Sequence, residues 1–480
     1  MNTIEIYNTE NVEENKQKEG EKVGLLSLLI ISISSTIGAG IFNIPQNIAD
    51  ATYAFFSLIF WVFTALAIYI ILLIYIRLSK LKPKESIYDH GKQLLGNYGG
   101  FLIGFGYYVS SVLTICCFDV SLANGMEYFF EGYFDEKENK YNIFLVTTSV
   151  LWIFFILYCN GLDKVLFLNA IATICKIFII IFYIIVLLIK MNTTQLKTDF
   201  WGKNNSFNEI FNQFKSTFII CIFCYLGIET STTLSSKSKD DKLVGLAINI
   251  AYFLCSILYL LSSFLSYGIY SKDDLSELGN PSMAGVLGEA LGKFGTYIIN
   301  FGMIISVLSC WLSWNVNFVE LFDKFTEDKI VSKFFAVKNK HNIPIFNLLF
   351  GTILIQTCLI LFTFLQEGLY LFIVNLSTVF FVPCYACSSI YLIYINLHLE
   401  TKSIKEIILG CLGIVISLIL LISFEIKYIL LSFAFYILGV ILYIAGIHEN
   451  GNKFNKLIEI IISIVMLVIL IVGIIYLIVV

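Results

Sequence analysis

The chain has 480 residues, of which 58% are hydrophobic and only 14% are charged. A typical soluble domain has about 25% charged residues, so this composition excludes an ordinary water-soluble fold and indicates a membrane protein. The net charge of −4 and the absence of basic patches with interleaved aromatic residues give no indication of nucleic-acid binding. The twelve cysteines are scattered, mostly within apolar segments, and have no metal-ligand spacing. We therefore expect no metal centre and no other cofactor.

Apolar segments long enough to cross a bilayer recur from residue 25 to residue 479. A membrane-spanning helix needs about 20 largely apolar residues, which predicts an all-α polytopic protein with 12–13 transmembrane helices. The number is 13 if the last segment crosses the membrane and 12 if it does not. The same segment determines on which side of the membrane the C-terminus lies. The predicted spans lie near residues 25–50, 55–78, 98–122, 143–160, 164–189, 212–234, 245–270, 295–320, 345–365, 369–396, 407–424, 428–447 and 457–479.

The charges of the loops predict how the chain is oriented. Basic residues are dense after the second, sixth and eighth spans, and these loops share one side if the first span runs outward. The loops near 131–138 and 272–277, on the opposite side, are richer in acid. Because basic loops stay in the cytoplasm, residues 1–23 are expected to form a cytoplasmic tail of a protein of the cell (inner) membrane. The basic residues are Arg77, Lys80, Lys82, Lys84 and Lys92; Lys237, Lys239 and Lys242; and Lys324, Lys329, Lys333, Lys338 and Lys340.

Small and polar residues interrupt the first span between Ser32 and Pro45. Gly38 and Gly40 flank Ala39, and glycine costs about 1 kcal/mol relative to alanine inside a helix. An unwound turn would free carbonyls at the end of one half-helix and amides at the start of the next, which together can hold an ammonium and a carboxylate. Such a turn is tolerated in hydrocarbon only beside protein or a polar cavity. The alternative is a continuous helix whose small residues pack against a neighbour.

A second interruption, in the sixth span, matches the first in position and character. Gly227 is followed by a polar cluster that contains Glu229. Paired interruptions at corresponding places in two halves indicate an inverted repeat of five plus five helices, with broken helices 1 and 6 and a site at mid-membrane. The expected divisions are the tail over 1–23, a ten-helix core over 24–396 with repeats over 24–190 and 210–396, and accessory transmembrane helices over 397–480.

Three ionisable side chains within predicted spans are candidates for function, because each costs about 2.5–3.5 kcal/mol in hydrocarbon. Glu229 is suited to exchange protons or to pair with a cationic substrate, and its alternative role is to cap backbone amides at the second break. Lys176 could occupy the place where sodium sits in sodium-coupled carriers of this kind. The alternative for Lys176 is that it extends to the membrane interface. Asp119 is expected near the outer end of the third span, where function and structure remain equal alternatives.

Two aromatic residues stand out by position among the 16% of the chain that is aromatic. Phe223 lies directly before the second break, and Trp314 lies in the eighth span, which packs against the first and sixth in broken-helix carriers. A ring over a cation contributes about 0.5–2 kcal/mol and closes the path of the substrate. Core packing is the alternative for each ring.

Several stretches of the chain resemble the amino acid–polyamine–organocation (APC) transporters. Within this superfamily they are most similar to the basic amino acid/polyamine antiporters, particularly the arginine/ornithine antiporters. The resemblance extends from the first predicted span to the tenth. The matching stretches are 35–47, 169–176, 226–229, 302–314, 333–340 and Val382-Pro383.

The resemblance implies where the backbone of the substrate binds. The family holds the substrate carboxylate at the amides of the first break, which correspond here to Ala39, Gly40 and Ile41. It holds the ammonium at carbonyls that correspond to the surroundings of Thr36 and Phe223. Both groups of an α-amino acid would then be bound by unwound main chain.

The resemblance also implies roles for side chains. Trp314 matches the stacking ring of the family, Glu229 its sixth-span acid, and Tyr107 its third-span gating tyrosine. Glu229 and Lys176 are the candidates for proton or ion coupling. The expected partners are a small amino acid or amine and the lipid bilayer, with a homodimer as a candidate assembly and no nucleic acid.

The chain departs from the family at positions that affect selectivity. The tryptophan of the sixth span is Phe223 here, and the asparagine that helps to bind a guanidinium falls at Ile115, which cannot form a hydrogen bond. Thr230 follows Glu229 where the family has a smaller residue. Losing a buried polar partner changes affinity by about 1–3 kcal/mol. The candidate substrates therefore include ornithine, lysine, another amino acid or an amine as well as arginine.

The sequence thus predicts a secondary transporter that exchanges a cationic amino acid for a related amino acid or amine by alternating access. The nearest alternative is proton-coupled uptake of a neutral amino acid, with Lys176 and Glu229 as proton carriers. A second alternative is a membrane sensor that binds amino acids without moving them. An enzyme is not expected, because the spans contain no Ser/His pair, no His-Glu-x-x-His motif and no suitable pair of aspartates.

Overall fold

The computed structural model describes residues 24–83, 85–133, 139–198, 200–202, 206–230, 241–365, 369–451 and 457–479. Within these ranges the regular structure is helical, and the β contact they contain is an isolated bridge between Lys338 and Pro344. The described parts of the predicted spans fall largely on helices, and the spans 25–50 and 369–396 are each divided between two helices. The prediction of an all-α polytopic fold is confirmed.

The helices follow one another with short connections. The first half contains α2 (Leu25–Thr36), α3 (Gly40–Ala51), α4 (Ala54–Leu81), α5 (Ile87–Glu127), α6 (Lys140–Cys159), α7 (Leu162–Lys190), α8 (Thr193–Thr198) and α9 (Phe207–Tyr225). The second half contains α11 (Asp241–Ser266), α12 (Lys272–Ser276), α13 (Ser282–Leu291), α14 (Lys293–Glu327), the 3-10 helix η2 (Lys333–Ala336), α15 (Ile345–Leu365), α16 (Leu369–Val379), α17 (Phe381–His398), α18 (Ile404–Ser423), α19 (Ile426–Glu449) and α20 (Leu457–Val479).

Nine helices within the described residues are long and apolar enough to cross a membrane, and the bent pair α2–α3 makes a tenth candidate. The predicted spans over 345–365 and 457–479 fall on α15 and α20, whose described apolar parts are shorter. The predicted span over 212–234 falls on α9 and continues into residues 231–240, which lie outside the described residues. The choice between 12 and 13 spans therefore stays a prediction.

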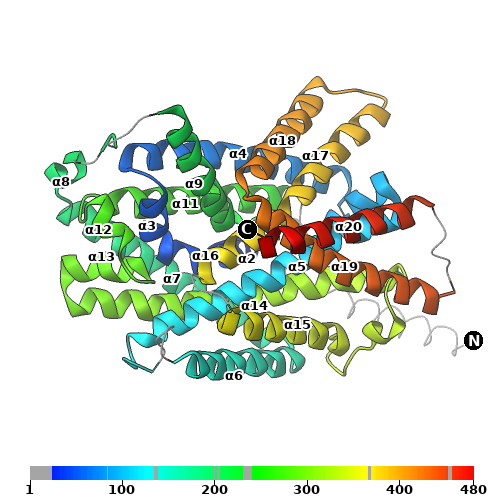
Figure 1. Ribbon diagram of the computed structural model, residues 1–480, viewed down its shortest axis with the longest axis horizontal. Coiled ribbons are helices and arrows are strands. Elements are labelled where there is room, and N and C mark those ends of the chain that lie inside the picture. The colour runs from blue at the N-terminus through cyan, green and yellow to red at the C-terminus, as the bar shows by residue number, and fades with distance from the viewer. Residues whose placement is uncertain are drawn as a thin grey trace, which may run out of the picture.

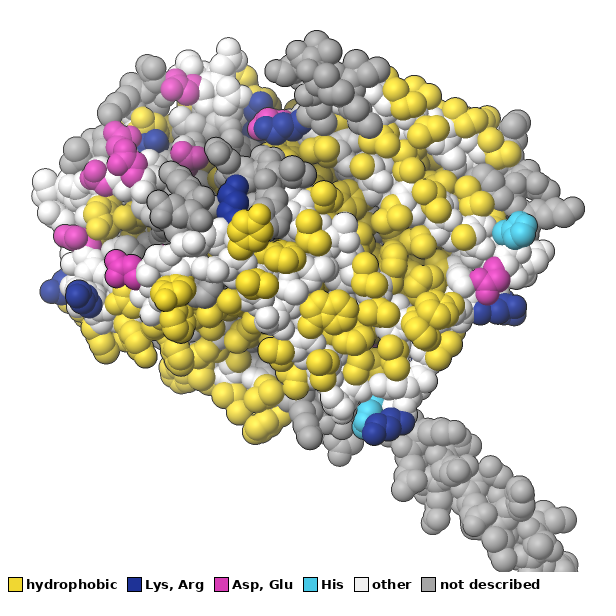
Figure 2. Space-filling model, turned by 60° about the horizontal axis from the view of Figure 1, so that its bottom comes forward, with side chains coloured by type: hydrophobic (Ala, Val, Ile, Leu, Met, Phe, Trp, Pro, Cys, Tyr) yellow, Lys and Arg dark blue, Asp and Glu magenta, His cyan; other side chains and the backbone are white. Residues whose placement is uncertain are grey.

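Most of the long helices run side by side along one direction, with α2, α5 and α14 near the middle and α6 at the edge (Figure 1). The long helix α5 packs against α14, α16 and α17, and α14 also contacts α2 and α7. The short helices α12 and α13 pack on α3 at one end of the molecule. Figure 2 shows a broad hydrophobic face with charged side chains gathered toward its edges, as expected for a surface in contact with lipid.

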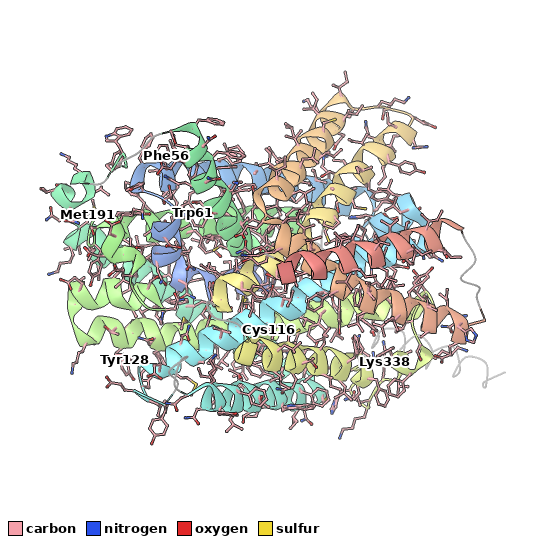
Figure 3. The ribbon with its side chains drawn as sticks, viewed as in Figure 1. Phe56, Trp61, Cys116, Tyr128, Met191 and Lys338 are labelled. Carbon is pink, nitrogen blue, oxygen red and sulfur yellow. The ribbon has the colours of Figure 1, made fainter. Side chains whose placement is uncertain are left out.

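The two ends of the molecule are marked by loops from different helices. Tyr128 directly follows α5, Lys338 lies in the loop after α14, and Figure 3 shows these residues at opposite ends with Cys116 between them. This alternation agrees with the predicted order of the loops. The basic positions Lys237 and Lys239 and the acidic segment 135–138 lie outside the described residues.

Helix α5 carries polar residues to the centre of the molecule. It begins with a capping box in which Ser86 and Asp89 bind each other's backbone amides. The helix then kinks at Gly96, which has a φ of 75°, and continues through the middle of the bundle. The kink separates the polar first turns from the segment that crosses the membrane.

Both predicted helix breaks are present. α2 ends at Thr36 and α3 begins at Gly40, and the two axes differ by 42°. α9 ends at Tyr225, and residues 226–229 form a turn in which Gly227 has a φ of 96°. The interpretation of the first span as a continuous helix is therefore wrong.

Candidate functional site

The two breaks lie against each other at the centre of the bundle. The hydroxyl of Ser35, at the end of α2, lies 2.9 Å from the carbonyl oxygen of Gly227 and 2.8 Å from the hydroxyl of Thr230. A Cβ atom added to Gly227 would lie 2.5 Å from the carbonyl oxygen of Ser35 and 3.1 Å from the ring of Trp314. Only glycine combines the positive φ of this turn with so close an approach.

Side chains from other helices bind the carbonyls at the end of α2. The last carbonyls of a helix have no partner within it, and an apolar bilayer offers none. The indole Nε1 of Trp314 donates to the carbonyl of Ser35 across 3.0 Å. The hydroxyl of Tyr259, on α11, lies 3.0 Å from the carbonyl oxygen of Thr36 and 2.9 Å from that of Cys224. Tyr259 thus joins the C-terminal ends of α2 and α9.

Lys176, on α7, also contacts the first break. Its Nζ is 2.5 Å from the carbonyl oxygen of Ile37, 3.1 Å from that of Ser34 and 3.2 Å from the hydroxyl of Ser309. The residue is fully buried, so the alternative that it extends to the membrane interface is wrong. Three oxygen partners match the three donors of an ammonium. Lys176 therefore places a cation among the freed carbonyls of α2.

A small cavity, called here the central cavity, lies between the two breaks and leaves about 10 Å³ open to the centre of a water molecule. It brings together four of the predicted substrate-binding residues: Thr36, Gly40, Phe223 and Trp314. None of its lining residues has a charged side chain. The lining residues are Ser35, Thr36, Gly38, Gly40, Thr114, Phe118, Phe223, Leu226 and Trp314.

The start of α3 borders this cavity through Gly40. Ala39 and Ile41 are buried beside it, and no side chain caps the N-terminus of α3. The first amides of a helix have no acceptor within it, and the helix dipole makes this end positive. The amide end of α3, at residues 39–41, is therefore positive and lies at the first break.

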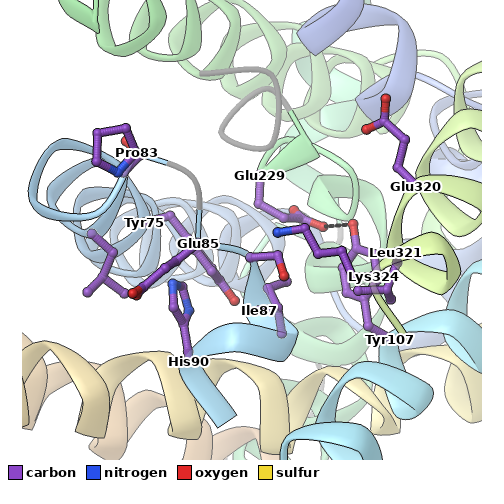
Figure 4. A pocket seen from close by; sticks show the side chains of 13 residues that line it. Tyr75, Pro83, Glu85, Ile87, His90, Tyr107, Glu229, Glu320, Leu321 and Lys324 are labelled. Atoms are coloured by element: carbon purple, nitrogen blue, oxygen red, sulfur yellow. Dashed lines mark hydrogen bonds between the residues drawn. The ribbon is translucent and has the colours of Figure 1, made fainter. Parts of the chain in front are cut away.

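Glu229 and Tyr107 border a second, larger cavity, called here the vestibule, which leaves about 80 Å³ open to the centre of a water molecule (Figure 4). The carboxylate of Glu229 accepts a hydrogen bond from the hydroxyl of Tyr107 at 3.2 Å and from the amide of Gly227 at 3.2–3.3 Å. Figure 4 shows Glu229 and Lys324 directed into the same part of the vestibule. Since Gly227 also contacts Trp314, the second break lies between the vestibule and the central cavity.

The vestibule lies toward the end of the molecule where α4 ends and α5 begins. Its wall includes Leu78 and Ser79 from the last turn of α4, and Glu85 and Ser86 from the connection that follows. The vestibule thus lies between this connection and the second break.

Sequence analysis missed several residues of the site. Thr114 and Phe118 both line the central cavity from one face of α5, whereas Ile115 is buried outside its lining. Tyr259 comes from a span that shows no interruption in the sequence. The spacing of four residues between Thr114 and Phe118 is the signal that could have revealed their shared face.

Asp119 differs from its predicted position at an outer helix end. It is fully buried within α5, and neither carboxylate oxygen has a hydrogen-bond partner. It is not among the residues that line the central cavity or the vestibule. The structure therefore gives Asp119 no contact with the candidate site.

A helical bundle that spans the membrane, with two facing helix breaks and a cavity between them, defines the class of broken-helix secondary transporters. The amino acid permease family matches residues 23–427, and the chain belongs to this family of the APC superfamily. The predicted resemblance is confirmed. The protein is thus a multi-pass membrane transporter of amino acids rather than an enzyme.

Individual relatives cover almost the whole chain. The chain is 31% identical over 478 residues to a Clostridium perfringens protein named "Putative amino-acid transporter", covering 96% of this chain and 99% of the relative. It is 29% identical over 443 residues to an arginine/agmatine antiporter of Chlamydia pneumoniae, covering 90% and 91%. It is 28% identical over 452 residues to an arginine/agmatine antiporter of Chlamydia felis, covering 92% of each chain.

Proposed function

We propose that this protein exchanges a cationic amino acid, such as arginine, ornithine or lysine, for a related amino acid or amine. The observation that carries the proposal is the central cavity between the amide end of α3 and the carbonyl end of α2. These two ends offer complementary partners for the carboxylate and the ammonium of an α-amino acid. Relatives named arginine/agmatine antiporters support a cationic substrate, because agmatine is the amine that corresponds to arginine.

In this proposal each wall of the central cavity has a role. The amides of residues 39–41 bind the carboxylate of the substrate. The carbonyls near Thr36 and Phe223 bind its ammonium, since a carbonyl oxygen has two lone pairs and can accept a second donor. The ring of Trp314 stacks on the side chain of the substrate and separates it from the second break.

The vestibule supplies the charge that the central cavity lacks. Glu85, Glu229 and Glu320 border it together with one lysine, Lys324. An excess of carboxylates in a cavity with low-dielectric walls raises the local concentration of cations. Glu229, held by the hydroxyl of Tyr107, then pairs with the cationic group of the substrate as it passes between the vestibule and the central cavity.

The proposal includes the location of the protein and the division of its chain. The protein lies in the cell membrane with its N-terminus in the cytoplasm, because the basic residues after α4 and α14 share one side. Residues 24–396 form the inverted-repeat core, and the family match over 23–427 covers all of it. A single cysteine introduced in the loop after α14 should react with an impermeant reagent only in inside-out vesicles, and labelling of intact cells would reverse the orientation.

Purified protein in liposomes tests the exchange. Uptake of labelled arginine should be fast when the liposomes contain unlabelled arginine, ornithine or lysine, and slow when they are empty. Equal rates in filled and empty liposomes would refute exchange. A competition panel of amino acids and polyamines on the outside then identifies the preferred substrate.

One observation favours a second candidate, the proton-coupled uptake of a neutral amino acid. The central cavity has no charged lining side chain, whereas Lys176 and Glu229, the two candidate proton carriers, lie beside the two breaks. In that case an inward pH gradient should drive uptake of a neutral amino acid into empty liposomes. Uptake that does not respond to the gradient would exclude this candidate.

A further inference from the structure

The side chain of Thr114 carries a buried hydroxyl group that forms no hydrogen bond within the protein. It lies on α5, lines the central cavity and is only 2% exposed. Its Oγ1 has no hydrogen-bond partner. Buried polar side chains are nearly always paired with protein or water, so an unpaired hydroxyl at a cavity wall is available to a ligand.

Several other buried threonines of this protein pair their hydroxyls within their own helix. Thr64 donates to the carbonyl of Phe60 at 2.8 Å, and Thr173 donates to that of Asn169 at 2.7 Å. This bond to the residue four positions earlier is the usual arrangement in apolar helices. Thr114 lies in the middle of a helix as well, and it departs from this pattern where its helix borders the central cavity.

The other polar side chains of the central cavity already have partners. The hydroxyl of Thr36 donates to the carbonyl of Ser32, and that of Ser35 lies within 2.9 Å of the carbonyl of Gly227. The indole of Trp314 donates to a backbone carbonyl. Phe118, Phe223 and Leu226 are apolar. Among these lining side chains, Thr114 alone has an unused polar group.

We propose that Thr114 is a specificity-determining residue that binds the polar group at the end of the substrate's side chain. The inference rests on the proposed function and adds the substrate class: α-amino acids whose side chain can form a hydrogen bond, in preference to apolar ones of the same length. A site built around one buried hydroxyl rejects the apolar analogue, because that analogue leaves the hydroxyl unpaired. Thr114 lies one residue before Ile115 and supplies a polar group from the same helix.

Exchange assays in liposomes test this inference with three variants of one side chain. Thr114→Val removes the hydroxyl at nearly constant shape, Thr114→Ser keeps it, and Thr114→Ala covers the case in which valine prevents insertion. Lysine and norleucine, which share a four-carbon side chain, compete with labelled arginine. We expect the preference for lysine over norleucine to fall at least tenfold in Thr114→Val and Thr114→Ala and to persist in Thr114→Ser.

Thr217→Val is the matched control, because Thr217 is also fully buried with an unpaired hydroxyl and lies outside the lining of the central cavity. Thr217→Val should prefer lysine over norleucine as strongly as the wild type does. If Thr114→Val and Thr114→Ala are inserted and keep the wild-type preference, Thr114 has no role in specificity while the proposed exchange stands. If the wild type itself exchanges no amino acid, the proposed function fails, and the inference fails with it.

Discussion

The ammonium of Lys176 donates to the carbonyl oxygen of Ile37 across 2.5 Å, at the point where α2 loses its helical winding. The same ammonium lies 3.1 Å from the carbonyl oxygen of Ser34. One side chain from α7 thus supplies donors to two carbonyls at the break, and the hydroxyl of Ser306 donates a second hydrogen bond to the carbonyl of Ile37 across 3.2 Å. A side chain from a distant span is therefore part of the first break.

Replacing Lys176 with methionine should destabilise the protein. The methionine side chain fills a similar volume but removes one hydrogen bond from each of two buried carbonyls, and a hydrogen bond from a charged donor contributes about 1.5–3 kcal/mol. We expect Lys176→Met to lower the melting temperature of the purified protein by several degrees, on the order of 2–4 °C per kcal/mol for a domain of 150–250 residues, and to abolish transport. Lys190→Met, at the exposed end of the same helix, is the control. Normal stability of Lys176→Met would show that the ammonium is dispensable at the break.

Lys176→Arg separates a fixed cation from a proton carrier. Arginine stays protonated at all relevant pH values. If transport by this variant depends on pH as it does in the wild type, Lys176 acts as a fixed charge. Loss of the response to a pH gradient, with exchange at equal pH retained, would identify Lys176 as the group that titrates.

The second prediction concerns Gly227, where the two breaks meet. A methyl group there would lie 2.5 Å from the carbonyl oxygen of Ser35, and alanine is strained at a φ of 96°. Strained backbone conformations cost about 1–3 kcal/mol, and the clash adds to this cost. We expect Gly227→Ala to reduce exchange at least tenfold in inserted protein.

Gly245→Ala is the matched control for Gly227→Ala. An added methyl group on Gly245 would find its nearest atom at 3.6 Å, which is an ordinary contact. Exchange should be close to that of the wild type. Equal activity of the two variants would mean that the main chain at Gly227 relaxes without consequence for transport. That result would contradict the view that transport requires the close approach of the two breaks.

The third prediction divides the two roles of Trp314. Trp314→Phe keeps an aromatic ring in the central cavity but removes the hydrogen bond to Ser35, which is worth about 1 kcal/mol. Trp314→Ala removes both. We expect a small loss of stability with near-normal affinity in the phenylalanine variant, and at least a tenfold rise in the KM for arginine in the alanine variant.

The indole of Trp311 provides the comparison, since it is fully buried and its Nε1 has no partner. Trp311→Phe therefore removes a nitrogen but no hydrogen bond, and its stability should exceed that of Trp314→Phe. Similar KM values in Trp314→Ala and the wild type would exclude this ring from substrate binding.

The sequence was sufficient to predict the two breaks and the residues that form them. Glycine next to polar residues within an apolar span is a local pattern, and the bilayer allows few structures that are compatible with it. The resemblance to the APC transporters then assigned Thr36, Gly40, Phe223 and Trp314 to one substrate site, and these four residues line the central cavity.

The partners that complete the breaks could not be predicted in this way. Tyr259 and Thr114 lie in spans without any interruption. Only the packing of α11 on α2 and α3, and the position of α5 beside the central cavity, place these side chains at the site. Glu229 and Tyr107 were expected to contact the substrate with the other site residues, yet they border the vestibule. A turn of a few residues separates the two cavities, and a sequence pattern cannot show on which side of such a turn a side chain lies.

The last prediction concerns Glu229, which faces the vestibule rather than the central cavity. Glu229→Gln keeps the size of the side chain and removes its charge. If the carboxylate pairs with the cationic end of the substrate, the KM for lysine should rise at least tenfold while the competition by norleucine is unchanged. Tyr107→Phe removes one hydrogen bond to the carboxylate, worth about 1.5–3 kcal/mol to a charged group, and should have a smaller effect in the same direction. Glu289→Gln, on the exposed face of α13, should behave as the wild type.

An equal loss of lysine and norleucine binding in Glu229→Gln would contradict charge pairing, since removal of a charge cannot weaken a neutral ligand by attraction alone. The loss would then reflect the hydrogen bonds from the amide of Gly227 to Glu229, which hold the second break in its turn. Tyr107→Phe distinguishes these cases. The substitution removes the hydrogen bond from Tyr107 to the carboxylate of Glu229 but keeps the hydrogen bonds between Glu229 and the amide of Gly227. A rise in KM for lysine alone in both variants assigns Glu229 to the path of a cationic substrate.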